Sequence, residues 1–172
     1  MSPLKQALLA HDLAGFTSLL DRGEDPSVPD EDGATIVHLA AMANDPKYLA
    51  VLLAHGANVD LRHGVTGAPP LVSALMGDRE PQFSALLEAG ADPNATDRMG
   101  NTPLHMAAKI NAHRQVLALL EAGANPDAIN AQYATFQRYL FMTPTSLLHE
   151  QARHEREAII AWLRGHDVPV SS

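Results

Sequence analysis

The sequence predicts an all-α solenoid of stacked antiparallel helix pairs, and three observations predict it. A Leu-Leu-x-x-Gly block, first seen at 19–23, occurs four times, and its glycines lie 33, 34 and 33 residues apart. A helix-start pattern precedes these blocks and is clearest at 101–108. Apolar residues make up 46% of the chain and are mostly Ala and Leu, which suit close-packed helices. Self-similarity at this period is typical of a solenoid, whose function lies in its surface.

Each predicted unit consists of a short helix, a longer helix and a loop that begins at glycine. Thr102-Pro103 marks the start of a first helix, because the hydroxyl caps free N–H groups and proline needs no donor there. The second helices carry apolar stripes at i, i+3 and i+4, as in Val116-Leu119-Leu120. The glycine of each Leu-Leu block then stands where a helix ends with positive φ.

The combination of Thr-Pro-Leu-His-x-Ala at 102–107, Leu-Leu-x-x-Gly-Ala at 119–124 and the 33-residue period resembles ankyrin repeats. The resemblance covers the whole chain as a single domain, 1–172. It implies helix pairs with projecting finger loops, and protein binding through the fingers and the concave first-helix face. It also implies no enzymatic activity, no catalytic residue and no cofactor. The expected units are 1–31 as an N-terminal cap, 32–65, 66–98, 99–140 with an inserted finger, and 141–172 as a C-terminal cap.

One spacing departs from the repeat. Thr102 and Thr143 are 41 residues apart, which predicts about eight inserted residues between the fourth and fifth units. The stretch is rich in residues that interfaces favour, namely Tyr133, Phe136, Arg138, Tyr139 and Phe141. We expect at least two of these aromatic side chains to be presented to a partner. The alternative is that they pin the insertion onto the neighbouring units.

Methionines recur on the face that the resemblance assigns to binding. Met42, Met76 and Met106 fall on first helices and Met99 on a finger. Methionine adapts to varied surfaces and is frequent at binding sites, although the same residues could be half-buried gap-fillers. We expect further contacts with the partner from Ile110 at the centre of this face. Charged contacts at its rim are expected from Arg98, Lys109 and Arg138.

Composition and residue spacing argue against several kinds of functional site. The net charge of −8 argues against a nucleic-acid partner, and the chain has no cysteine for a disulfide or a thiolate metal site. His149 and His154 are five residues apart, whereas a helical metal pair needs i, i+4, so no metal site is expected. His38 and His105 are expected to form structural hydrogen bonds. The acidic run 24–32 could attract a basic partner or could simply be solvated.

The predicted function is therefore a module that binds a specific protein partner and is monomeric alone. It could be an immunity protein or antitoxin that occludes an enzyme, or an adaptor or host-directed effector. An enzyme and a self-assembling structural protein are weaker alternatives. The sequence shows neither a signal peptide nor a membrane-spanning run, so a cytoplasmic location is expected. The excess of Arg over Lys and the abundant Ala favour a bacterial source.

Overall fold

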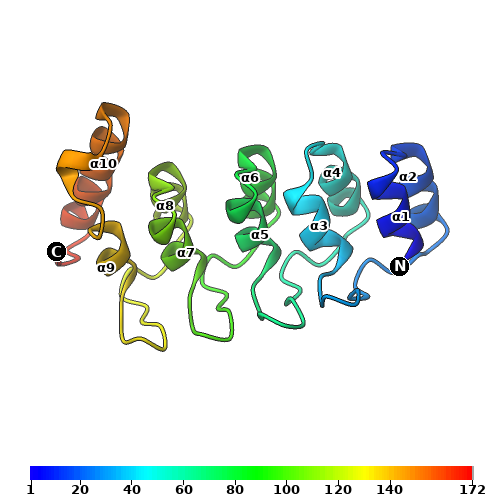
Figure 1. Ribbon diagram of the computed structural model, residues 1–172, viewed down its shortest axis with the longest axis horizontal. Coiled ribbons are helices and arrows are strands. Elements are labelled where there is room, and N and C mark those ends of the chain that lie inside the picture. The colour runs from blue at the N-terminus through cyan, green and yellow to red at the C-terminus, as the bar shows by residue number, and fades with distance from the viewer. Residues whose placement is uncertain (172) are drawn as a thin grey trace. The chain divides into compact units, whose positions relative to one another are not determined.

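A computed structural model describes residues 1–171, and within that range every regular element is a helix. The chain divides into two compact units, Met1–Arg98 and a second that begins at Met99. Each unit is built from the same motif, a first helix that starts beside a finger loop and a second helix that returns antiparallel to it (Figure 1).

The first unit contains three helix pairs. Neighbouring first helices contact each other, α1 with α3 and α3 with α5, and α2 contacts α4 in the row of second helices. The bounds of these helices are α1 Pro3–Leu9, α2 Leu13–Asp21, α3 Ile36–Met42, α4 Lys47–Ala54, α5 Pro70–Met76 and α6 Glu80–Glu88.

The second unit contains two helix pairs. First helix α7 packs on α9 and second helix α8 packs on α10. A 3₁₀ turn interrupts the connection within the last pair. The bounds are α7 Pro103–Lys109, α8 His113–Glu121, α9 Phe136–Leu140, η1 Thr145–Leu147 and α10 Glu150–Gly165.

In α3 and α7 a histidine near the helix start ties the first helix to the next finger, which is the structural role that the sequence predicted. The backbone N–H of Thr102 donates to Nδ1 of His105 at 3.2 Å, which leaves Nε2 to donate to the carbonyl oxygen of Ala134 at 2.9 Å. His38 repeats this arrangement, with its Nε2 3.1 Å from the carbonyl oxygen of Ala68. Val72 stands at the equivalent place in the third pair, so that pair lacks the bond.

Neighbouring fingers are joined by single backbone hydrogen bonds. In the first unit Gly64 N–H donates to the Gly33 carbonyl, and Arg98 N–H donates to that of Thr66. In the second unit Ala131 N–H donates to Met99. These bonds hold each finger in a fixed register with its neighbour inside the unit.

The cores follow the predicted stripes. In the first unit Phe16, Leu52 and Leu86 are fully buried, and the Phe16 ring meets Tyr48 edge-on with centroids 5.1 Å apart. In the second unit Leu119 of α8 and Ile159 of α10 are fully buried. The leucine and phenylalanine positions of the repeat therefore form the buried core of each unit.

The structure differs from the predicted boundaries of the last two units. The fifth first helix begins at Phe136, with Thr135 as its N-cap, so it starts inside the segment assigned to 99–140. Thr102 to Thr135 is an ordinary 33-residue step. The extra residues lie after α9, in the segment 141–149 between the two helices of the last pair. Thr143-Pro144 resembled a helix start, but ψ of Pro144 is 140° and only a 3₁₀ turn follows.

Candidate partner-binding surface

A row of exposed apolar side chains crosses the first helices of the first unit. Leu9, Met42 and Met76 occupy the same repeat position, near the ends of α1, α3 and α5, and are 57%, 46% and 54% exposed. We call these three residues the apolar ladder. Because α1, α3 and α5 are neighbours, side chains that recur at one position lie in a row, which differs from the scattered apolar residues of an ordinary surface.

The ladder is held on a fixed backbone. Arg79 donates through Nε to the Met42 carbonyl at 3.0 Å and through Nη2 to Asn44 Oδ1 at 2.6 Å. Gln82 Nε2 donates to the Ala43 carbonyl at 2.6 Å. These bonds satisfy the carbonyls at the end of α3, which the helix itself leaves free. A cavity of about 230 Å³, lined in part by Leu9, Met42 and Arg79, lies beside the ladder.

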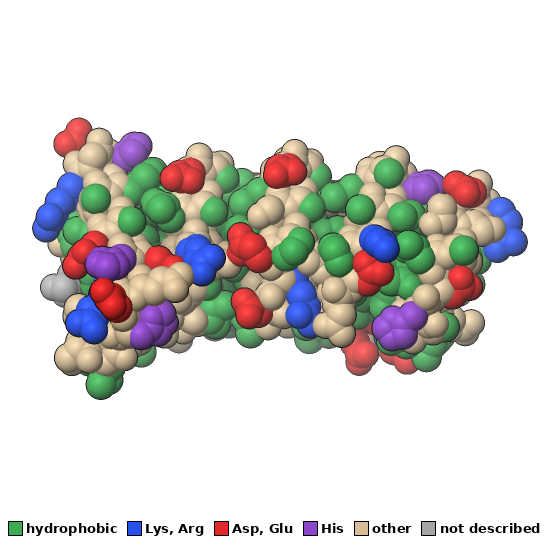
Figure 2. Space-filling model, turned by 90° about the horizontal axis from the view of Figure 1, so that it is seen from above, with side chains coloured by type: hydrophobic (Ala, Val, Ile, Leu, Met, Phe, Trp, Pro, Cys, Tyr) green, Lys and Arg blue, Asp and Glu red, His purple; other side chains and the backbone are tan. Residues whose placement is uncertain are grey.

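Acidic residues outnumber basic ones in this unit. Residues 1–98 contain 14 acidic and 6 basic side chains, whereas residues 99–172 contain 6 of each, so the whole net charge of −8 belongs to the first unit. Seen from above, the space-filling view shows apolar side chains interspersed with acidic ones over the helices (Figure 2). An apolar contact surface on a unit of net negative charge favours a partner with apolar and basic groups.

The second unit has a polar residue where the ladder position recurs. Lys109 donates through Nζ to Asn101 Oδ1 at 2.8 Å and lies 4.5 Å from the centre of the Tyr139 ring. Its ammonium group is therefore engaged within the unit. Ile110 is exposed next to it, and Met106 is half-buried, as the gap-filler alternative expected for that methionine.

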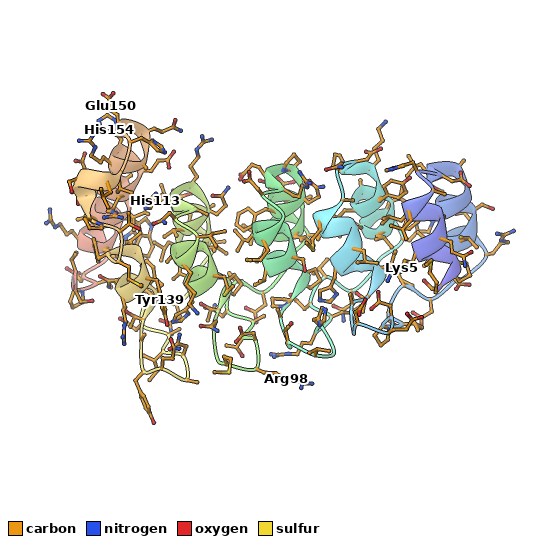
Figure 3. The ribbon with its side chains drawn as sticks, in the orientation of Figure 1. Lys5, Arg98, His113, Tyr139, Glu150 and His154 are labelled. Atoms are coloured by element: carbon orange, nitrogen blue, oxygen red, sulfur yellow. The ribbon has the colours of Figure 1, made fainter. Side chains whose placement is uncertain are left out.

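Two predicted contacts lie on fingers. Met99 is exposed at the start of the second unit. Arg98 is exposed as well, but its Nη2 donates to the Gly64 carbonyl at 2.6 Å, so its guanidinium braces the neighbouring finger of the first unit (Figure 3).

At least two aromatic side chains of the stretch 133–141 were expected to be presented to a partner, and this is wrong for Phe136 and Tyr139, which pack as the alternative expected. Phe136 is 1% exposed and Tyr139 is 8% exposed, because both belong to α9 and pack on α7. Phe141 is half-buried. Tyr133 and Arg138 are exposed, and Tyr133 is 88% exposed.

A buried polar network that the sequence did not reveal supports the last finger. Asn130 Nδ2 donates to Asn101 Oδ1 at 2.9 Å and to the Tyr139 hydroxyl at 2.8 Å. That hydroxyl donates to Gln132 Oε1 at 2.6 Å. The sequence does show Asn101 and Asn130 in predicted finger loops, where asparagine commonly bonds its own backbone. It does not show that the two side chains bond each other, because they lie on different fingers.

A second unforeseen cluster lies between α8 and α10. His113 and Arg156 are 2% and 4% exposed. Within the described residues neither nitrogen of His113 is hydrogen-bonded, and Arg156 uses only Nη1, which donates to the Thr143 carbonyl at 2.8 Å. Burial lowers the pKa of His113, and the nearby charge of Arg156 lowers it further. The arrangement joins the segment 141–149 to α10.

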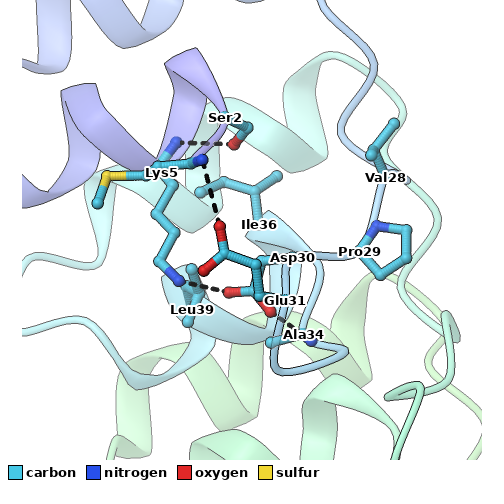
Figure 4. Close-up of a pocket in the computed structure, with 10 residues that line it drawn as sticks. Ser2, Lys5, Val28, Pro29, Asp30, Glu31, Ala34, Ile36 and Leu39 are labelled. Atoms are coloured by element: carbon cyan, nitrogen blue, oxygen red, sulfur yellow. Dashed lines mark hydrogen bonds and ion pairs between the residues drawn. The ribbon is translucent and has the colours of Figure 1, made fainter.

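A cavity of about 290 Å³ lies beside the first finger of the first unit (Figure 4). Lys5 of α1 donates to Asp30 of the finger at 2.5 Å across it. This hydrogen bond raises the pKa of Lys5 and lowers that of Asp30. Each group neutralises the other, so Lys5 is not the free surface residue that a solvated cap would carry. The pair fixes the first finger to α1.

The two histidines that were considered as a metal pair, His149 and His154, lie at the start of α10 and have no shared site. His149 caps α10 by accepting from the Ala152 N–H at 3.2 Å, and His154 is exposed near Glu150 on the same helix (Figure 3). Among residues 1–171 no group of three His, Cys, Asp or Glu side chains is arranged to hold a metal ion. No helix in that range is long and apolar enough to cross a membrane.

Comparisons with known proteins agree with this geometry. A family model described as ankyrin repeats in three copies matches residues 4–97, and a single ankyrin repeat model matches residues 99–131. The chain is 48% identical over 108 residues to Protein PhlB of Serratia liquefaciens, covering 63% of this chain and 48% of that protein.

More distant similarity extends to large eukaryotic proteins. The chain is 40% identical over 91 residues to E3 ubiquitin-protein ligase KEG of Arabidopsis thaliana, and 37% identical over 81 residues to Inversin of Gallus gallus. The matches cover 52% and 47% of this chain but only 6% and 7% of those proteins. The chain thus spans less than half the length of each of these three relatives.

Proposed function

The chain belongs to the ankyrin repeat family and is a protein–protein interaction module, and from that premise we propose that it binds one specific protein through the first-helix face and the fingers. The observation that carries the proposal is the apolar ladder of Leu9, Met42 and Met76. Exposed side chains of this kind cost solvation free energy unless a partner covers them. The net negative charge of the first unit supports a partner whose contact surface is apolar and flanked by basic groups.

We further propose that the module acts by occlusion, as an immunity protein or antitoxin that covers the active site of an enzyme. The exposed Leu9, Met42 and Met76 side chains recur across neighbouring first helices, and a row of this kind is suited to covering a site on a partner. An adaptor that tethers its partner without inhibiting it is the second candidate, and it rests on the same surface. We propose that the protein is monomeric without its partner, and a cytoplasmic location stays a prediction.

A pull-down with identification of the captured proteins by mass spectrometry tests the module. The variant Leu9→Gln, Met42→Gln, Met76→Gln keeps similar side-chain size and helix propensity while removing the apolar surface. It should fold normally and lose the partner captured by the wild type. Leu147→Gln changes an apolar residue that is 75% exposed outside the ladder and the fingers, and it should retain the partner. Equal capture by all three proteins contradicts the proposed surface.

The purified partner then distinguishes the two candidates. If the partner is an enzyme, stoichiometric addition of the wild-type protein should abolish its activity and the ladder variant should not. Full activity in the saturated complex would reject occlusion and favour an adaptor. Gel filtration of the isolated protein checks the monomer, since self-assembly predicts a concentration-dependent shift that the ladder variant loses.

A further inference from the structure

The tip of the last finger carries a tyrosine at a position that is otherwise glycine. Gly33, Gly67 and Gly100 occupy this repeat position in the earlier fingers, with φ of 85°, 74° and 73°. Tyr133 occupies it in the last finger, with φ of 54°. All four backbones are left-handed, which glycine adopts freely and a bulky L-residue does not.

Crowding explains the glycines but does not explain the tyrosine. A Cβ at Gly33 would stand 3.0 Å from the Gly64 Cα, and one at Gly100 would stand 3.3 Å from the Asn130 Cα, so a side chain there would crowd the next finger. No further finger follows Tyr133 among the described residues, and a side chain therefore fits. Space permits a side chain there, but the unfavourable φ is still present for any residue except glycine.

Nothing within the described part of the second unit compensates for this backbone strain. The Tyr133 side chain is 88% exposed, and its hydroxyl makes no hydrogen bond within residues 1–171. Neither packing nor the Asn130 network, which uses the hydroxyl of Tyr139, explains its presence. A strained residue that contributes nothing to the fold is an indication of function.

The finger presents this side chain on a rigid hairpin. Tyr133 N–H donates to the Asn130 carbonyl at 2.9 Å, and Asn130 N–H donates to the Ala134 carbonyl at 3.1 Å. Asn130 Oδ1 accepts from the N–H groups of Gln132 and Ala134 at 3.0 and 3.2 Å. Because the backbone is already fixed, ordering the tyrosine on binding costs little entropy.

We propose that Tyr133 is an anchor that inserts into an apolar pocket of the protein partner, a pocket that also offers the phenol a hydrogen-bond acceptor. This inference rests on the proposed function and names a contact that the ladder does not include. Ile129, 61% exposed on the same finger, extends the apolar contact. The second unit has equal numbers of acidic and basic side chains, so the anchor binds through burial of its ring and not through charge.

The strain predicts an unusual stability result. Tyr133→Gly removes the unfavourable φ and should raise the midpoint of thermal unfolding by about 2–4 °C. Asp167→Gly is the matched control, because Asp167 is exposed with φ of 56° in the same unit and lies outside the ladder and the fingers, and it should raise the midpoint as well. A lower midpoint for Tyr133→Gly would show that the tyrosine supports the finger, and it would overturn the proposal.

The binding arm uses a photo-crosslinking p-benzoylphenylalanine at position 133, in cells of the source organism. One discrete adduct should form, and none should form from position 157, an exposed site on α10. With the crosslinked protein purified, Tyr133→Gly should weaken binding at least thirtyfold, and Tyr133→Phe much less. The loss should be similar in low and high salt, and Asp167→Gly should bind as the wild type does.

The two proposals fail in different ways. If Tyr133→Gly binds as tightly as the wild type while the ladder variant loses the partner, the anchor is wrong and the module stands. If the ladder variant binds normally and Tyr133→Gly does not, the anchor stands and the first-helix surface is wrong. If both bind normally, or no adduct forms at position 133, the anchor is rejected.

Discussion

The side-chain amide of Asn130 lies 2.8 Å from the hydroxyl of Tyr139. The bond joins the last finger to α9, and the same amide nitrogen reaches Asn101 on the preceding finger at 2.9 Å. All three residues are buried. A single asparagine therefore fixes the finger that carries Tyr133. The importance of this network can be tested by measuring the free energy of unfolding of variants.

Asn130→Ala should destabilise the protein by about 2–3 kcal/mol, because it leaves buried partners without hydrogen bonds. Tyr139→Phe removes one hydroxyl and should cost only about 1 kcal/mol. Chemical denaturation of each variant and of the double variant measures the coupling between them. Costs that simply add would show that the two side chains do not act together.

Buried leucines of the second helices should dominate stability. Leu86→Ala in the first unit and Leu119→Ala in the second each remove a fully buried side chain, at an expected cost of about 2–5 kcal/mol. The exposed Glu157→Ala on α10 should stay within roughly 0.5 kcal/mol. Lys5 is unsuitable as a surface control because it pairs with Asp30. If Glu157→Ala lowers the midpoint of thermal unfolding as much as the leucine variants do, the assignment of the leucines to the repeat core is wrong.

Acid should weaken the second unit through His113. Its folded pKa lies below the ordinary value of 6.5 because of burial, and then because of Arg156 and His149, while Glu155 acts in the opposite sense. Between the folded pKa and about pH 6.5 the unfolded chain binds the proton first. The stabilising contribution is thus complete above about pH 6.5 and is lost as the pH falls through the folded pKa.

His113→Leu should flatten the fall in stability below pH 6.5 and leave stability at pH 7.5 unchanged or higher, since it removes two buried nitrogens without partners. Melting midpoints from pH 7.5 to 5 provide the measurement. Burial also lowers the pKa of His38, so part of the acid sensitivity should remain. The exposed His154→Gln is the control, and a slope that His113→Leu does not change would contradict the assignment.

The protein should not bind nucleic acid at physiological salt. Its charge of −8 lies wholly in residues 1–98, and residues 99–172 are balanced, so neither unit offers net positive charge to the phosphate backbone. Fluorescence anisotropy with labelled DNA and RNA at micromolar protein should show no change. Binding that weakens steeply with added salt would disprove the prediction.

The sequence by itself determined the repeat, because its signals are local. A hydroxyl before Pro103, an apolar stripe such as Val116-Leu119-Leu120 and a glycine such as Gly123 each act within one or two helical turns. The structural role of His105 was also predictable, since its Nδ1 accepts from the Thr102 N–H three residues away. The start of the last helix pair was misplaced where the local signal was false, at Thr143-Pro144.

Only the tertiary structure decided which polar and aromatic side chains are buried. Phe136 and Tyr139 read as interface residues, and α9 packs them onto α7, while Tyr133 a few residues earlier is left almost fully exposed. Asn101 and Asn130 pair across two fingers, and His113 is buried with Arg156 between α8 and α10. Burial depends on what a neighbouring repeat places opposite a side chain, and the local pattern around a residue does not contain that information.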